Sequence, residues 1–234
     1  MFRAPLYALA LATLPAFAPS RAEACRLALA LGFDVSRSVD AADYRVQVDG
    51  IVAALFDTEI RALILDSPDP VAMALFEWAG PGEQRLIADW TLLHGAPEID
   101  ELARRMLGHE RRFNGLTAVG SPLDYGRDLF TRAPECLWQT LDMAGDGQSN
   151  AGPEPLSRYA GARFEGITVN GLAIAAHEGM ILPWFERNVL HGPGAFAELA
   201  RNHEDFAEAF RRKLIRELSP FVIGATDPGA ERPS

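Results

Sequence analysis

The sequence predicts an α/β fold in which a doubly wound, mostly parallel central sheet carries helices on both faces. This prediction rests on two observations. Short apolar runs alternate along the chain with amphipathic stretches of helical spacing, and such alternation is typical of parallel sheets. Two of the apolar runs also end in an aspartate, and in open parallel sheets ligands bind at the carboxyl ends of the strands.

Strands are predicted where a short apolar run is bounded by turn residues. Two of these runs are separated by Gly80-Pro81-Gly82, which predicts a tight connection between them. The expected strands are residues 27–33, 71–78, 85–93, 137–143, 167–174 and 195–200.

Helices are predicted where apolar residues recur at helical spacing. Asp40 is the expected cap of the first helix. Pro183 fits the first turn of a later helix, where its missing N–H is tolerated. Residues 60–65 form only a short apolar run. The expected helices are residues 41–56, 99–109, 119–131, 155–164, 180–190 and 206–218.

The chain is expected to consist of a leader, one domain and a tail. Residues 1–24 combine Arg3, an apolar stretch too short to span a bilayer, and the cleavage-like triplet Ala22-Glu23-Ala24. This pattern predicts a secretory signal peptide, and hence a periplasmic or secreted protein. Residues 25–225 form the domain, and the polar residues 226–234 form a disordered tail. Cleavage after Ala24 would leave Cys25 first, so lipidation of this cysteine stays open as an alternative.

Net charge and hydropathy narrow the class of partner. The formal charge of −10 makes nucleic acids and anionic lipids poor partners. After the leader, no segment reaches the roughly 18 uninterrupted apolar residues that a membrane helix needs. We therefore expect a single exported domain without a membrane span.

Oxygen-bearing side chains follow two of the predicted strands. Asp34, Ser36 and Ser38 alternate after the first strand, so they share one side of an extended backbone. A carboxylate with two hydroxyls suits a hard cation such as Mg²⁺ or Mn²⁺. Taken alone, the motif also fits a capped strand-to-helix loop. A metal site is favoured because Thr117 lies on a glycine-bounded loop and Asp146 ends another apolar run.

These three motifs, in this order, resemble the metal-ion-dependent adhesion site of von Willebrand factor type A domains. The chain is also similar to an exported bacterial family of such domains, DUF1194. The resemblance implies a non-catalytic domain that holds Mg²⁺ or Mn²⁺, less readily Ca²⁺. A protein partner's aspartate or glutamate would complete the metal's coordination and act as a buried hot spot. The implied metal ligands are Asp34, Ser36, Ser38, Thr117 and Asp146.

The resemblance also makes the strands that precede Asp34 and Asp146 parallel neighbours. Cys25 and Cys136 would then lie at the same edge of the sheet, opposite the metal. The spacing of neighbouring strands permits a disulfide, and export favours one. In the chain-entropy model such a bond contributes about 4–5 kcal/mol to stability. The alternative is a pair of buried free thiols.

Three residues beside the motifs are candidates for the rim of the site. Arg37 stands where a small residue is frequent in the resembled family. It either attracts an acidic partner, partly covers the metal or points into solvent. Gln148 and Asn150 follow Asp146 and either line the rim or form an ordinary turn.

The histidines carry no metal-binding motif. His177-Glu178 opens a zinc-protease pattern, but residue 181 is isoleucine, so the second histidine ligand is missing. The others stand apart in sequence, and we expect each to be solvent-exposed or in a loop. These are His94, His109, His191 and His203.

Two other functions stay open beside the binding domain. An open Mg²⁺ position also serves metal-dependent hydrolases, although no general base is tied by motif to this site. In the third hypothesis the metal only holds the loops of a scaffold together. The partner's identity, the preferred metal and the oligomeric state do not follow from the sequence.

Overall fold

The computed structural model describes residues 25–219, which fold around one six-stranded sheet with the strand order β3-β2-β1-β4-β5-β6. β3 runs antiparallel to β2, and every other neighbouring pair is parallel. The mostly parallel sheet predicted from the sequence is therefore confirmed. The strands are β1 (Cys25–Asp34), β2 (Val71–Trp78), β3 (Gln84–Leu93), β4 (Cys136–Gly145), β5 (Ile167–Ile174) and β6 (Ala197–Ala200).

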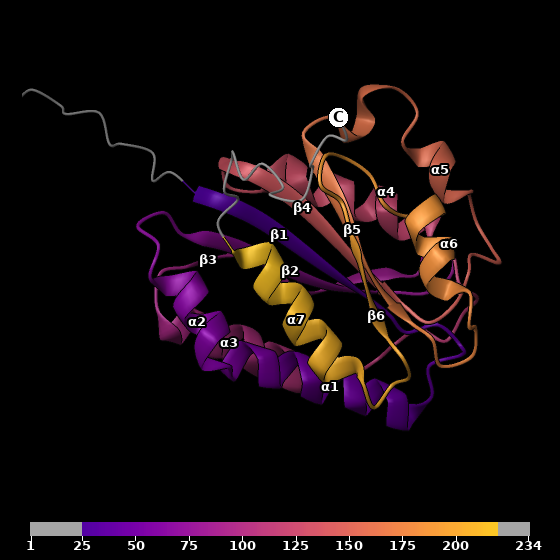
Figure 1. Cartoon of the computed structure of the whole chain (residues 1–234), viewed down its shortest axis with the longest axis horizontal. Helices are drawn as coiled ribbons and strands as arrows, with labels where there is room; N and C mark the ends of the chain where they lie inside the picture. The colour runs from indigo at the N-terminus through magenta and orange to yellow at the C-terminus, as the bar shows by residue number, and fades with distance from the viewer. Residues whose placement is uncertain (1–24, 220–234) are drawn as a thin grey trace, which may run out of the picture.

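The helices form two layers, one on each face of the sheet (Figure 1). One layer contains α1, α2, α3 and α7, which pack on one another, and the other contains α4, α5 and α6. The helices are α1 (Ala41–Phe56), α2 (Thr58–Leu65), α3 (Ala96–Leu107), α4 (Gly120–Leu129), α5 (Pro155–Arg158), α6 (Ile181–Asn188) and α7 (Phe206–Leu218).

The alternation of side chains along β1 supplies both layers. Leu29 and Leu31 pack into the core under α1 and α7, whereas Ala28 and Ala30 face the core under α4 and α6. The small residues leave room for the large rings of β2: a Cβ on Gly32 would lie 2.4 Å from the ring of Phe76. Because both faces are covered, β1 is buried along almost its whole length. Its end is thereby fixed rigidly in the centre of the molecule.

The structure differs from the prediction in two stretches. Residues 60–65 belong to α2, whose cap Asp57 accepts hydrogen bonds from the backbone N–H groups of Glu59 and Ile60. The helix expected over 155–164 is wrong as one element. It consists of the single turn α5 and a 3₁₀ turn at Gly161–Phe164. Gly161, with a φ of 73°, separates them, since an α-helix cannot pass through that backbone conformation.

The disulfide implied by the resemblance is present. Cys25 and Cys136 are paired residues of the parallel neighbours β1 and β4. Their Cα atoms lie 4.2 Å apart, and their sulfurs are bonded. The bond joins the amino-terminal ends of the two strands whose opposite ends carry Asp34 and Asp146. It therefore fixes the relative position of the two aspartate-bearing strands.

The predicted signal peptide and the predicted tail lie outside the described residues. Within residues 25–219, none of the helices combines the length and the apolar character needed to cross a bilayer.

Candidate metal centre

The five predicted metal ligands meet at the carboxyl edge of the sheet. Asp34 is the last residue of β1, and Asp146 directly follows β4, its parallel neighbour. Ser36 and Ser38 lie on the loop between β1 and α1, and Thr117 lies on the loop before α4. The structure therefore brings three segments together that are far apart in sequence.

The hydroxyl groups form a continuous chain of hydrogen bonds that ends on Asp146. The Thr117 hydroxyl donates to Ser36 Oγ over 3.1 Å. Ser36 Oγ lies 3.2 Å from Ser38 Oγ, and the Ser38 hydroxyl donates to Asp146 Oδ1 over 2.6 Å. Thr117, Ser36 and Asp146 are buried, and Ser38 is exposed. The cluster thus opens to solvent on the side of Ser38.

Hydrogen bonds hold the loop after β1 in place. Asp34 Oδ1 accepts a 2.7 Å bond from the backbone N–H of Ser36, which closes the turn after β1. The Arg111 guanidinium donates to the carbonyl oxygens of Val35 and Ser36 over 2.8 and 2.9 Å. These bonds fix atoms of the loop itself, so the loop is preorganised before any ligand binds.

The threonine loop is held by Asn150. Its Oδ1 accepts from the backbone N–H of Thr117 over 2.9 Å. Its own backbone N–H donates to the Thr117 carbonyl over 2.8 Å. Asn150 is exposed and contacts Thr117, so it lies beside the cluster. Its contacts assign it a positioning role toward Thr117.

The electrostatics of the cluster call for a cation. Asp34 Oδ2 and Asp146 Oδ2 are both buried, and neither forms a hydrogen bond. Burial, and then repulsion by Asp146, raise the pKa of Asp34 to about 7. A buried acceptor without a partner costs about 1–3 kcal/mol. A divalent cation would satisfy both oxygens and remove the repulsion, and five oxygen-bearing side chains are the donor set that Mg²⁺ or Mn²⁺ prefers.

Two buried histidines lie at this edge that the sequence did not mark as functional. His109 and His203 lie in loops, one of the two predicted alternatives, but both side chains are almost fully enclosed. His203 Nε2 lies 3.5 Å from Asp146 Oδ2, and the ring of His177 lies 6.3 Å from that of His203. His109 Nε2 instead lies 3.0 Å from the buried carboxylate of Glu77. No local spacing signals these contacts, because they join residues that are distant in sequence.

The remaining rim residues lie beside the cluster. Arg37 is exposed, and the backbone N–H of Gln148 donates to the Glu178 carboxylate over 3.4 Å. A hollow of about 490 Å³ adjoins the loop after β1, and Arg37, Arg111 and Arg112 contribute to its lining. Guanidinium groups therefore gather beside the oxygen cluster although the whole chain is acidic.

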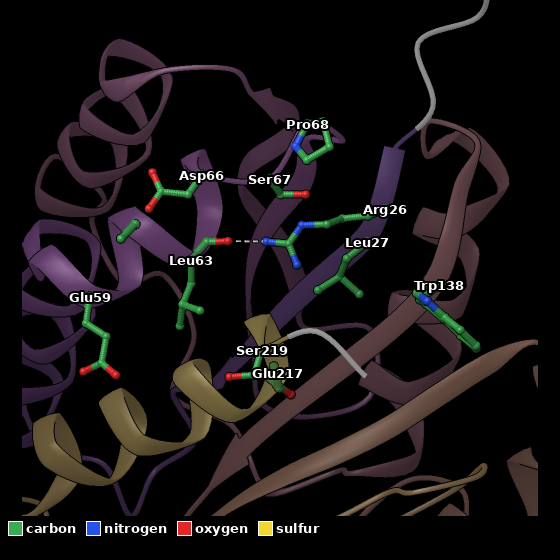
Figure 2. A pocket seen from close by; sticks show the side chains of 11 residues that line it. Arg26, Leu27, Glu59, Leu63, Asp66, Ser67, Pro68, Trp138, Glu217 and Ser219 are labelled. Atoms are coloured by element: carbon green, nitrogen blue, oxygen red, sulfur yellow. Dashed lines mark hydrogen bonds between the residues drawn. The ribbon is translucent and has the colours of Figure 1, made fainter. Parts of the chain in front are cut away.

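A larger cavity, of about 600 Å³, lies at the opposite end of the strands. Figure 2 shows Arg26 of β1 directed at the carbonyl oxygen of Leu63, with Trp138 of β4 on the other side of the cavity. The Arg26 guanidinium also donates to the Leu218 carbonyl over 2.9 Å. None of the five predicted metal ligands lines this cavity. Through these two bonds Arg26 joins β1 to α2 and α7.

Residues 24–222 match the model of the family described as "Protein of unknown function (DUF1194)". No curated protein has a significant match to the sequence.

Solved structures share the fold. Proximal thread matrix protein 1 from the mussel byssus has a TM-score of 0.62 and 16% identity, over 83% of this chain and 48% of that one. A further structure of it, with a zinc-occupied metal-ion-dependent adhesion site, has a TM-score of 0.57 and 13% identity, over 82% and 47%. The von Willebrand factor type A protein from Catenulispora acidiphila has a TM-score of 0.58 and 14% identity, and the match covers 83% of this chain and 43% of that one. This chain thus spans about half the length of these proteins.

An aerotolerance-related membrane protein from Bacteroides fragilis matches over nearly its own full length. Its TM-score is 0.53 at 14% identity, and the match covers 82% of this chain and 99% of that chain. At these identities the likeness establishes the fold, which is that of the von Willebrand factor type A domain.

Proposed function

This chain belongs to the DUF1194 family and has the von Willebrand factor type A fold, and from that premise we propose that it is an exported, non-catalytic binding domain. It engages a protein partner through a divalent cation, Mg²⁺ or Mn²⁺. The cation is held by Asp34, Ser36, Ser38, Thr117 and Asp146.

One observation carries this proposal: Asp34 and Asp146 are buried close enough together for Asp146 to raise the pKa of Asp34, and each has an oxygen without a hydrogen bond. Folding has brought like charges together, which is unfavourable unless a cation joins them. Three hydroxyl groups adjoin the pair and add oxygen donors without adding charge. The zinc ion in the corresponding motif of the mussel protein supports a divalent ion in this type of site.

The charge balance indicates the partner's chemistry. A divalent ion held by two carboxylates and neutral hydroxyls retains affinity for a further anion. The three arginines beside the site add positive potential in an otherwise acidic protein. A surface aspartate or glutamate of a protein partner suits both features. On binding it would be desolvated against the cation, which is typical of a hot-spot residue.

Export is supported by two features. Cys25 and Cys136 form a disulfide, and such bonds persist in oxidising compartments. Solved neighbours include a minor pilin from Streptococcus sanguinis and a pilus adhesin from Lactobacillus rhamnosus. We therefore assign the protein to the periplasm or the exterior, after cleavage near Ala24.

The test is thermal unfolding of the oxidised protein in EDTA and then with Mg²⁺, Mn²⁺ or Ca²⁺. A ligand that binds only the folded state adds about 2.7 kcal/mol at a hundredfold excess over its Kd. We expect this gain for the natural sequence and for Asp49→Ala, an exposed aspartate of α1. Asp34→Ala should lose the gain. The proposal fails if no cation changes the unfolding temperature, or if Asp34→Ala responds like the natural sequence.

The partner is tested by capture from a periplasmic extract on immobilised protein. A protein that is retained in Mg²⁺, released by EDTA and not retained by Asp34→Ala supports the binding function. Retention that survives EDTA would show that the metal does not mediate the contact. A purely structural metal predicts instead that Asp34→Ala unfolds the domain.

A further inference from the structure

A second group of metal-ligating side chains adjoins the oxygen cluster and shares one residue with it. Asp146, His177 and His203 each offer a ligand atom, and these three atoms lie within 4.8 Å of one another. Around a tetrahedral zinc ion, ligand atoms lie roughly 3.3 Å apart. His177 is exposed, so its side chain has room to move toward the other two ligands.

Three different connections of the sheet supply these residues. Asp146 follows β4, His177 follows β5, and His203 lies between β6 and α7. All three lie at the carboxyl ends of parallel strands, which is where this class of fold places its ligands. The rigid strand ends therefore determine the spacing of the three side chains.

The buried members of the group are unsatisfied. Both ring nitrogens of His203 are buried and form no hydrogen bond, and the same is true of Asp146 Oδ2. His203 Nε2 faces that oxygen at 3.5 Å, beyond hydrogen-bond length. A neutral imidazole normally uses both nitrogens. A metal ion between the two atoms would satisfy His203 and Asp146 together.

The two oxygens of Asp146 serve different neighbours. Oδ1 accepts from the Ser38 hydroxyl, on the side of the oxygen cluster, whereas Oδ2 faces the imidazole of His203. Asp43 of α1 adds a further carboxylate on the histidine side, with its Oδ2 3.7 Å from His203 Nε2. The carboxylate of Asp146 is thus placed between two donor sets of different chemistry.

We propose that Asp146, His177 and His203 form a second metal site, for a zinc-class transition-metal ion, which shares Asp146 with the oxygen site. Imidazole nitrogen favours zinc-class ions, whereas an all-oxygen set favours Mg²⁺ or Mn²⁺. Three protein ligands leave one position of a tetrahedral zinc ion open to an exogenous ligand. The proposal differs from the function proposed above in resting on His177 and His203, which the oxygen site does not use, although the two sites share Asp146.

The experiment is a titration of the EDTA-treated, dialysed full chain with Zn²⁺ by calorimetry, and with Co²⁺ by visible absorption. We expect one Zn²⁺ to bind with nitrogen ligation, and His177→Ala to weaken it by more than about tenfold. Because His177 is exposed, this variant should keep the fold. His203→Gln should weaken Zn²⁺ binding similarly. His94→Ala removes an exposed histidine on the far side of β3 and should leave Zn²⁺ affinity unchanged.

Two results overturn the proposal. One is a Zn²⁺ affinity that His177→Ala and His203→Gln both leave unaltered while Asp34→Asn abolishes it, because zinc then binds the oxygen site alone. The other is the absence of Zn²⁺ binding to the natural sequence. The two proposals can fail independently. If the oxygen site is correct, stabilisation by Mg²⁺ should vanish in Asp34→Ala and persist in His177→Ala.

Discussion

Two buried carboxylate clusters lie on strand β4 and directly after it, and one of them contains a lysine whereas the other does not. Asp142 faces the fully buried Lys213 of α7, whose Nζ lies 2.6 Å from Asp142 Oδ2 and 2.6 Å from Glu217 Oε1. Asn170 completes this cluster by donating to Glu217 over 2.8 Å. Four residues later, Asp146 lies close enough to Asp34 to raise its pKa, and both of these carboxylates keep a buried oxygen without a hydrogen bond, as Asp142 and Glu217 do.

The difference separates a structural cluster from a binding cluster. At Asp142 the protein supplies the compensating charge itself, so the cluster joins α7 to the sheet without needing a ligand. At Asp34 the charge that acts on the carboxylate is a second carboxylate. Buried charges are stable only when they are paired or bind metal. The cluster without a lysine is therefore the one that we assign to an external cation.

The largest effect is expected when the internal cation is removed. Lys213→Met should lower the free energy of unfolding by about 3–5 kcal/mol, because it leaves two buried carboxylates uncompensated. Denaturant unfolding in EDTA measures this. The combined change of Asp142→Asn, Glu217→Gln and Lys213→Met should recover most of the loss, since no charge then stays buried. A single Lys213→Met protein as stable as the natural one would contradict the structural role of the cluster.

The pH dependence of the metal-free protein compares the two clusters directly. The pKa of Asp34 rises from 3.8 to about 7, by burial first and then by repulsion from Asp146. Burial and then the charge of Asp142 raise the pKa of Glu217 to about 7 as well. Each group therefore binds its proton more tightly in the folded state. Their contribution to stability is complete below about pH 4 and is lost as the pH rises through about 7.

In EDTA we therefore expect the free energy of unfolding to fall between about pH 4 and pH 7. Asp34→Asn and Glu217→Gln should each flatten this fall, and Asp34→Asn should stabilise the metal-free protein above pH 7 by about 1–3 kcal/mol. Excess Mg²⁺ should remove the part due to Asp34 and leave the part due to Glu217. If Mg²⁺ changed the pH dependence of stability equally in Asp34→Asn and in Glu217→Gln, the two clusters would not differ in the way proposed.

The smallest effect is expected at the edge of the oxygen cluster. Asn150→Ala removes the acceptor for the backbone N–H of Thr117 but no metal ligand. We expect about a tenfold loss of Mg²⁺ affinity, as for other residues that orient metal ligands, with little change in stability in EDTA. Asn188→Ala is a matched control, because its side chain donates to the Trp184 carbonyl in α6. If Asn150→Ala lowered Mg²⁺ affinity as much as Asp34→Ala does, Asn150 would itself be a metal ligand.

The sequence by itself determined the architecture and the oxygen site. Residue patterns along single segments placed all six strands of the sheet and most of the helices. The motif at Asp34, together with Thr117 and Asp146, named the five residues that the structure brings together. This was possible because the ordered motifs resemble those of type A domains, and the resemblance implies which residues share a location. The pairing of Cys25 with Cys136 follows from the strand order that the same resemblance implies.

Only the tertiary structure decided what surrounds that site. Lys213 and Glu217 have the spacing of an ordinary exposed helix pair, and the packing of α7 against the sheet buries them instead. His203 lies in a loop before α7, and the same packing brings it to Asp146. Neither contact has a local signature, because helix packing joins residues that no strand register relates. The sequence therefore predicted the cluster at Asp34 and Asp146. The lysine cluster and the position of His203 became visible only from how α7 packs on the sheet.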